Sequence, residues 1–408
     1  MNLPAINRLR SLRVALVHYW FVRRRGGERV LEALADLFPG ADLFFVVADR
    51  NELPPALGAR NVHTSFVQKL PGSLRWHRHF LPLYPLALEQ FDLSGYDLVI
   101  SSESGPAKGV VTGARTCHLC YCHSPMRYLW DHYHHYRAGN NFGTATRLAF
   151  SAAAHYLRLW DLASASRVDH FVANSETTAA RIRKHYRREA EVIFPPVATD
   201  DFPLAEPGDH YLVVGHLADY KRVDLAIEAC AALGRRLRIV GVGEQYRRLK
   251  RLAGGQAEFL GVLPDREVRR EYASCRALLF PGEEDFGMVP VEAMAAGRPV
   301  IAFGRGGVTE TVLGAGRGRA PEEATGLLFV EQTGSSLADA IRRFEAAERR
   351  FRPERIRRHA QRFGPAAFAE RFLGFAAAAF AEFEHGGSRS GLRGEFAAGG
   401  AAAAVVAR

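Results

Sequence analysis

Residues 281–300 have the sequence PGEEDFGMVPVEAMAAGRPV, and the order of residue types in this stretch decides the fold class. The apolar run before Pro281 predicts a strand, and Gly287 predicts a tight loop in which the backbone approaches a neighbour closely. Pro290 suits the first turn of a helix, and Gly297 suits its carboxyl end. Because Val300 begins another apolar run, the stretch predicts the strand–helix–strand unit of a parallel sheet.

The same alternation of short apolar runs and helical patterns extends in both directions along the chain. It stops at Pro195-Pro196 and the polar segment 200–209, which predict a hinge, and then starts again. Strands are expected at residues 13–20, 42–48, 97–102, 117–122, 170–174 and 191–194, and then at 211–215, 237–241, 258–260, 277–281 and 300–303. We therefore predict an α/β fold of two Rossmann-like domains, residues 1–200 and 201–385, that face each other across a cleft. We expect the last helix to pack back on the first domain, and residues 386–408 to form a disordered tail.

The composition is that of a globular protein of about two domains: 408 residues, 48% of them hydrophobic and 24% charged. Disordered, collagen-like and disulfide-scaffold classes are excluded. No stretch approaches the roughly 18 apolar residues that cross a bilayer. The apolar run at residues 14–22 lacks a signal-peptide cleavage site and predicts a buried strand. We therefore expect a cytoplasmic protein that either stays in solution or binds peripherally to the inner face of the plasma membrane.

The net charge of +10 suits an anionic partner, whether nucleic acid, anionic lipid or a phosphorylated ligand. Scattered arginines without a recognised motif do not favour nucleic acid. Residues 69–88 combine basic and aromatic side chains, among them Arg75, Trp76 and Arg78, which suits a membrane surface. A packed loop with solvated arginines is the alternative for this segment.

The five cysteines do not predict a metal site. Cys117, Cys120 and Cys122 lie in the segment CHLCYCH at residues 117–123, but Cys230 and Cys275 supply no second ligand pair at a zinc-binding spacing. If the segment is a strand, Cys117 and Cys120 point to opposite faces. We therefore predict buried cysteines and expect no metal.

Two carboxylates flank the helix that residues 281–300 predict. Glu284 lies in the loop before the helix, and Glu292 lies on the helix. A helix N-terminus offers free N–H groups and a positive dipole end to a phosphate, while carboxylates accept hydrogen bonds from sugar hydroxyls. The alternative is a solvated Glu284 and a Glu292 that only stabilises the helix dipole.

This segment resembles the signature of the retaining family 4 glycosyltransferases, in which two glutamates are separated by seven residues and Phe-Gly follows the first. Further segments similar to that family are residues 173–175, 192–197, 211–215, 220–229, 304–312 and 325–329. Residues 92–102 and 121–131 are most similar to the O-antigen mannosyltransferase subgroup. The resemblance implies the GT-B fold, in which two Rossmann-like domains enclose the site.

The resemblance also implies residue roles. Lys221 would neutralise the donor diphosphate as it leaves, Glu284 would contact hydroxyls of the transferred sugar, and His123 would face the reacting sugar. Glu292 would bind the nucleotide ribose. The donor-binding residues would be Gly26, Gly27, His216, Lys221, Phe286, Gly287, Met288 and Glu292.

One position departs from the family pattern. His216 stands where the family usually has an arginine that accompanies the lysine on the diphosphate. A neutral imidazole offers one donor, whereas a guanidinium offers five and a fixed charge. Either the site depends more on Lys221 and an arginine such as Arg222, or His216 is protonated beside the diphosphate.

The function implied is the retaining transfer of a hexose from a nucleotide sugar to a lipid-linked or polysaccharide acceptor in cell-surface glycan synthesis. The subgroup favours mannose from GDP-mannose, with a UDP-linked sugar as the other donor. No Asp-x-Asp occurs in the chain, so we expect neither a metal nor another cofactor. The alternatives are a sugar-phosphate synthase or phosphorylase on the same fold, and a non-catalytic glycan-assembly protein.

Overall fold

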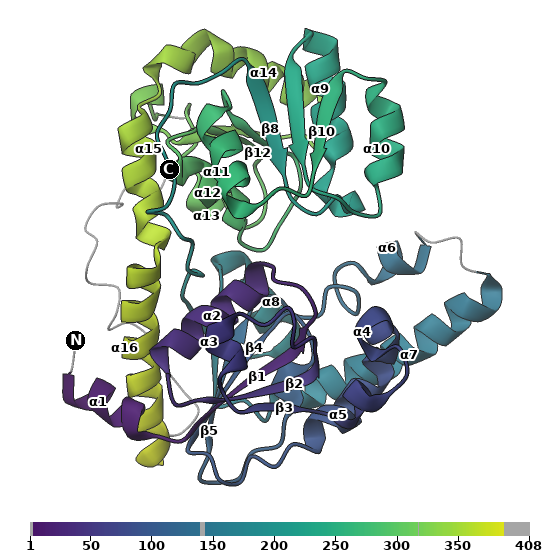
Figure 1. Ribbon diagram of the computed structural model, residues 1–408, viewed down its shortest axis with the longest axis vertical. Coiled ribbons are helices and arrows are strands. Elements are labelled where there is room, and N and C mark those ends of the chain that lie inside the picture. The colour runs from purple at the N-terminus through teal and green to yellow at the C-terminus, as the bar shows by residue number, and fades with distance from the viewer. Residues whose placement is uncertain (1–2, 139–142, 317, 387–408) are drawn as a thin grey trace, which may run out of the picture.

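The computed structural model describes residues 3–138, 143–316 and 318–386. Two separate sheets form its framework, each covered by helices, and Figure 1 shows them as two lobes stacked along the long axis. This arrangement confirms the predicted fold class of two Rossmann-like α/β domains. The tail expected at residues 386–408 lies outside the described residues, apart from Gly386.

Both sheets are parallel throughout the described residues. The first has strand order β3-β2-β1-β4-β5-β6-β7 and the second β10-β9-β8-β11-β12-β13. The strands are β1 (Val14–Phe21), β2 (Asp42–Ala48), β3 (Val62–Thr64), β4 (Leu98–Glu103), β5 (Cys117–Cys122), β6 (His170–Ala173), β7 (Ala190–Val192), β8 (His210–Val214), β9 (Arg236–Val240), β10 (Ala257–Gly261), β11 (Leu278–Phe280), β12 (Val300–Phe303) and β13 (Gly326–Phe329). The sequence pattern did not indicate the edge strands β3 and β13.

Helices connect the strands on both sides of each sheet. The α-helices are α1 (Leu3–Ser11), α2 (Gly26–Leu37), α3 (Pro55–Gly58), α4 (Ser73–Trp76), α5 (Tyr84–Glu89), α6 (Tyr133–Ala138), α7 (Thr144–Ala165), α8 (Glu176–Tyr186), α9 (Val223–Leu233), α10 (Tyr246–Ala253), α11 (Asp265–Ser274), α12 (Met288–Ala295), α13 (Val308–Thr311), α14 (Gly334–Ala347), α15 (Pro353–Ala360) and α16 (Pro365–Glu384). None of these helices has the length and apolar composition that crossing a bilayer requires.

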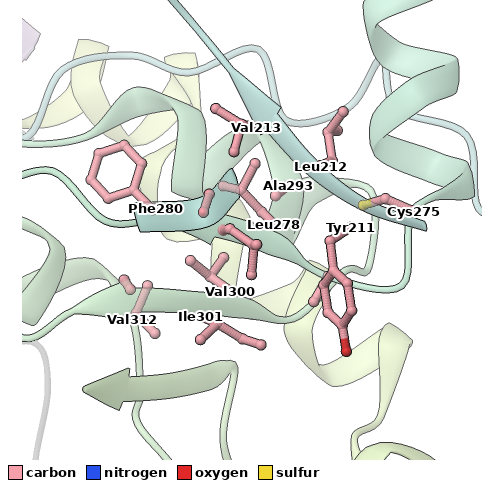
Figure 2. Close-up of a cluster of buried hydrophobic side chains, with 14 of the residues drawn as sticks. Tyr211, Leu212, Val213, Cys275, Leu278, Phe280, Ala293, Val300, Ile301 and Val312 are labelled. Atoms are coloured by element: carbon pink, nitrogen blue, oxygen red, sulfur yellow. The ribbon is translucent and has the colours of Figure 1, made fainter. Parts of the chain in front are cut away.

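The core of the second lobe forms where β8, β11 and β12 meet α12. Figure 2 shows Leu278, Val300 and Ile301 on the inner strands, with Ala293 of α12 close to them. Strands covered on both faces are apolar along their whole length, as parallel strands of doubly wound sheets are. The stretch that predicted the fold therefore lies at the centre of this lobe.

The last helix, α16, runs beside the first lobe in Figure 1, where α15 lies beside the second, and completes the core of the first. Phe368, Phe372 and Phe375 are buried together with Leu98 of β4 and Leu119 of β5. Burial of aromatic side chains stabilises a fold by about 1.5–3 kcal/mol each. The end of the chain therefore ties the second lobe to the first.

The five cysteines are buried and form no disulfide, which confirms the prediction for them. Cys117, Cys120 and Cys122 lie on β5, a strand whose six residues are all buried. These side chains act as small apolar core residues.

Candidate active site

The loop that carries Glu284 leads from β11 into α12 and is held by backbone contacts. Gly287 has φ of 83°, a left-handed conformation that favours glycine. A Cβ on Gly306 would lie 2.3 Å from the carbonyl oxygen of Glu284, and one on Gly307 2.2 Å from that of Asp285. The two glycines thus allow the next strand–helix connection to pack directly on this loop, which fixes its shape.

Glu284 forms an ion pair with Lys221, whose side chain is largely buried. Lys221 ends the short 3-10 helix η4 (Asp219–Lys221), which follows the carboxyl end of β8. Burial lowers the pKa of the Lys221 ammonium to about 7, and the positive charge of Arg127 adds to the shift, which Asp285 opposes. The sequence pattern predicted these two residues for one site, and the structure brings them into contact.

A small pocket lies beside this ion pair, at the carboxyl ends of β8 and β11. Its lining includes Gly215, His216, Lys221, Phe280 and Gly282. Gly215 has φ of 141°, and a Cβ on it would approach the Lys221 amine to 3.9 Å. In open α/β sheets, ligands bind at the carboxyl ends of the strands, so this pocket lies where a ligand is expected.

Glu292, on α12, is held from two directions. Its Oε2 accepts a hydrogen bond of 2.7 Å from the buried Tyr272 hydroxyl, and its Oε1 accepts one of 2.8 Å from Arg29 of α2, in the first lobe. The carboxylate predicted to bind a ribose therefore forms an ion pair between the lobes in this structure.

The first lobe contributes the N-terminus of α2 and two histidines, the buried His18 and the partly buried His123. A Cβ on Gly26 would lie 2.9 Å from the Met288 sulfur of the other lobe. A Cβ on Gly27 would lie 3.8 Å from His123 Nε2 and 3.9 Å from His18. The structure therefore places the predicted residues Gly26, Gly27, His123 and Met288 together, and α2 comes close to α12 because residue 26 has no side chain.

Both histidines are neutral. Burial lowers the pKa of His123 to about 4 and that of His18 to about 3. Both contact Ser102 at the end of β4: its hydroxyl lies 3.1 Å from His123 Nε2, and its carbonyl oxygen lies 2.5 Å from His18 Nδ1. His123 can therefore exchange hydrogen bonds with a ligand without carrying a charge.

Several arginines of the first lobe cross to carboxylates of the second, and the sequence pattern assigned no role to Arg29, Arg127 or Arg181. Besides Arg29, both Arg127 and Arg181 contact Asp285, the residue after Glu284. In addition, Glu310 accepts hydrogen bonds from the first two N–H groups of α8. No sequence spacing indicates these pairs, because their members lie more than 100 residues apart.

Three remaining candidates have more local partners. Phe286 is buried against Phe194 and Phe363 near the hinge, so its side chain packs the core. Arg222 bonds Asp224 of its own helix at 3.1 Å and is not directed at the pocket by that contact. His216 lines the pocket, with Nε2 2.9 Å from the Glu244 carboxylate.

Two facing Rossmann-like domains with this arrangement define the GT-B fold. Two family models match the chain: residues 24–201 match the model described as Glycosyltransferase Family 4, and residues 199–363 the model described as Glycosyl transferases group 1. The chain is therefore built as a two-domain glycosyltransferase, with a family 4 domain followed by a group 1 domain.

Curated relatives match parts of the chain. A D-inositol 3-phosphate glycosyltransferase of Kineococcus radiotolerans is 32% identical over 40% of this chain and 42% of its own length. The α-1,3/1,6-mannosyltransferase ALG2 of Mus musculus is 25% identical over 60% of this chain and 68% of its own length. The chain spans less than half the length of the first relatives it matches.

Solved structures share the fold over most of the chain. Anabaena Alr3699/HepE, solved in complex with UDP and glucose, superposes with a TM-score of 0.66 and 16% identity over 89% of this chain and 99% of its own. Sucrose-phosphate synthase of Thermosynechococcus elongatus has a TM-score of 0.64 and 21% identity over 90% and 99%. At such identities the likeness shows the fold.

Proposed function

We propose that this protein transfers a hexosyl group from a nucleotide sugar to a lipid-linked or polysaccharide acceptor in cell-surface glycan synthesis. The proposal rests chiefly on the Lys221–Glu284 ion pair, which lies beside a pocket at the carboxyl ends of β8 and β11. A cation suits a diphosphate leaving group, and a carboxylate suits sugar hydroxyls. A nucleotide sugar carries both a diphosphate and sugar hydroxyls. Its diphosphate would pair with Lys221 and its hydroxyls would bond Glu284, so the donor would replace the ion pair between these two residues.

The chemistry follows from what each side chain can do. The Lys221 ammonium stabilises charge that develops on the diphosphate as the glycosidic bond breaks. Glu284 accepts hydrogen bonds from the sugar and thereby positions it. His123, which is uncharged, contacts the opposite side of the sugar. We propose retention of the anomeric configuration, and no metal, since the cation and the helix dipole of α12 supply the positive potential.

GDP-mannose is the donor that we favour. ALG2 is named a mannosyltransferase, and a 28% identical relative in Mycobacterium tuberculosis is named a GDP-mannose-dependent mannosyltransferase. A UDP-linked hexose is the other donor to be tested, and the melting temperature of the protein with GDP or UDP compares the two. If GDP raises the melting temperature and UDP does not, the result supports GDP-mannose. If only UDP raises it, the donor proposal is wrong.

A phosphorylated acceptor is the second candidate, because several relatives are named D-inositol 3-phosphate glycosyltransferases. A transfer assay distinguishes the two acceptors. Purified protein is incubated with labelled GDP-mannose and either a polyprenyl-linked sugar or an inositol phosphate. Transfer to the lipid-linked acceptor supports the first proposal, and transfer only to the phosphorylated polyol supports the second. If the protein cleaves none of the nucleotide sugars, the result supports a non-catalytic protein.

We also propose that the first lobe binds an anionic membrane surface, where a lipid-linked acceptor would lie. Between Leu148 and Ala163, α7 exposes no residue that carries a fixed charge. The exposed residues there are Leu148, Ala149, Ala152, His155, Tyr156, Leu159, Leu162 and Ala163. Arg147 and Arg137 lie at the N-terminal part of this face, the latter 3.1 Å from Ser151. An apolar helix face with cations beside it suits anionic lipid.

The predicted segment 69–88 adds exposed Trp76, Leu83 and Leu86, together with Arg75. Co-sedimentation with phosphatidylglycerol vesicles tests the surface. We expect Leu159→Glu/Leu162→Glu to abolish binding, and Leu252→Glu, an exposed leucine of the second lobe, to leave it unchanged. Recovery of the wild-type protein in the supernatant would refute the membrane proposal.

A further inference from the structure

The second lobe supplies the pocket beside Lys221 with less positive charge than a bound diphosphate would need. His216 stands at the position where a second cation would be expected, and it is paired with Glu244. Arg222, the neighbour of Lys221, bonds Asp224. A diphosphate carries negative charge on two phosphoryl groups, so one lysine leaves part of that charge uncompensated.

Arg127 of the first lobe lies near Lys221, which lines this pocket. Its guanidinium carbon is 5.7 Å from the centre of the Tyr220 ring, and the Lys221 amine is 5.6 Å from the centre of the same ring. Arg127 also contacts Asp285, which follows Glu284 in the loop. The side chain is 19% exposed, so it is confined to this place between the lobes.

The nearness of the two cations has a cost that a bound anion would remove. The charge of Arg127 helps to lower the pKa of Lys221, because two like charges share a largely buried region. Asp285 compensates Arg127 in part. A diphosphate between the two cations would attract both of them and relieve their repulsion.

We propose that Arg127 supplies, from the first lobe, the second positive charge of the diphosphate site. This inference rests on the proposed use of a nucleotide sugar. It assigns Arg127 a hydrogen-bonded contact with the donor diphosphate, so that the donor bridges both lobes. It also explains how the site tolerates a histidine at position 216.

Arg181 offers a matched control. It contacts the same Asp285, and its guanidinium also lies 2.8 Å from Asp131 and 3.7 Å from Glu283. Arg181→Gln therefore removes an ion pair between the lobes without removing a charge beside Tyr220. If Arg127 only holds the lobes together, the two glutamine variants should behave alike.

Calorimetric titration of the full chain with GDP, UDP and the two free nucleosides tests the assignment. We expect Arg127→Gln to weaken binding of the preferred nucleoside diphosphate about ten- to hundredfold, the effect of one charge-assisted hydrogen bond. Arg181→Gln should change it less than threefold, and nucleoside binding should be unchanged in both. His216→Arg should restore most of the affinity in the Arg127→Gln background.

Equal affinities of wild-type protein and Arg127→Gln for the diphosphate would overturn the inference, as would equal losses in the two glutamine variants. If Arg127→Gln does not fold, Arg127→Lys retains the charge and should bind within tenfold of wild type. A hundredfold loss in that variant without rescue by His216→Arg would contradict the proposal. A wild-type protein that binds no nucleoside diphosphate would instead refute the proposed function.

Discussion

The two lobes bring different chemistry to the region between them. The second lobe contributes carboxylates and one buried lysine, whereas the first contributes arginines and two neutral imidazoles. Glu292 and Asp285 are occupied by arginines of the opposite lobe, while Lys221 and Glu284 neutralise each other within their own lobe. If the proposed function holds, the comparison teaches that a donor would exchange ion pairs in the second lobe, whereas the imidazole of His123 would meet the sugar without loss of a charged partner.

The largest expected effect comes from the carboxylate of the second lobe. Glu284→Gln should lower turnover about 100- to 1,000-fold, as loss of one preorganised polar group at a reacting centre does, with little change in nucleoside diphosphate affinity. Glu283→Gln is the matched control, because Glu283 is the more exposed neighbour. Initial rates with labelled donor, compared with titration by the diphosphate, measure both. Equal rates in the two variants would show that Glu284 has no role at the reacting centre.

The imidazole of the first lobe should give the next largest effect. His123→Asn should lower turnover about tenfold to hundredfold and leave diphosphate affinity unchanged, because the proposed function places this side chain on the sugar side. His118→Asn is the control: His118 is buried on β5, and its Nε2 bonds the Ser101 hydroxyl at 2.9 Å. If His123→Asn weakens diphosphate binding and His118→Asn does not, His123 contacts the diphosphate of the donor and not its sugar.

The lysine should give the binding of a nucleotide sugar a pH dependence. Free Lys221 has a pKa of about 7, and a bound diphosphate would raise it. The charged form binds best, so affinity should be highest below pH 7 and should fall up to tenfold per pH unit as the pH rises through that value. Lys221→Arg should flatten this profile between pH 6.5 and 8.5. A flat wild-type profile would contradict the role of the lysine.

Three histidines with lowered pKa values predict a loss of stability in acid. Burial lowers the pKa of His118 and His18 to about 3 and that of His123 to about 4, below the value of about 6.5 in an unfolded chain. The unfolded state therefore binds more protons below pH 6.5, and each histidine costs up to about 1.4 kcal/mol of unfolding free energy per pH unit. Urea titrations between pH 7 and 5 measure this slope, and His118→Asn should reduce it. A slope of zero would show that these imidazoles are hydrated.

Much of the second lobe could be predicted from the sequence because its site is carried by a contiguous motif. Glu284, Gly287 and the start of α12 lie within one strand–loop–helix unit, and Lys221 follows a strand in the same pattern. The spacing of residues predicts a site where the residues that form it lie close together in the sequence.

The contacts between the lobes could not be predicted, because they depend on how two separate sheets face each other. Arg29 and Glu292 are 263 positions apart, and no periodicity links them. The sequence offered Arg222 as one possible aid to Lys221, and it did not indicate that Asp224, two residues on, bonds this arginine. The edge strand β3 was missed because only one of its three residues, Val62, is apolar.

One measurement tests the account most directly: release of nucleoside diphosphate from labelled nucleotide sugars by purified wild-type protein and Glu284→Gln, at donor concentrations that saturate both. We predict that the wild-type protein cleaves at least one donor, GDP-mannose first among them, in the presence of a chelator. Glu284→Gln should bind that donor equally well and cleave it at least a hundredfold more slowly. Cleavage by the variant at the wild-type rate would contradict the claim that the Lys221–Glu284 pair marks the reacting centre.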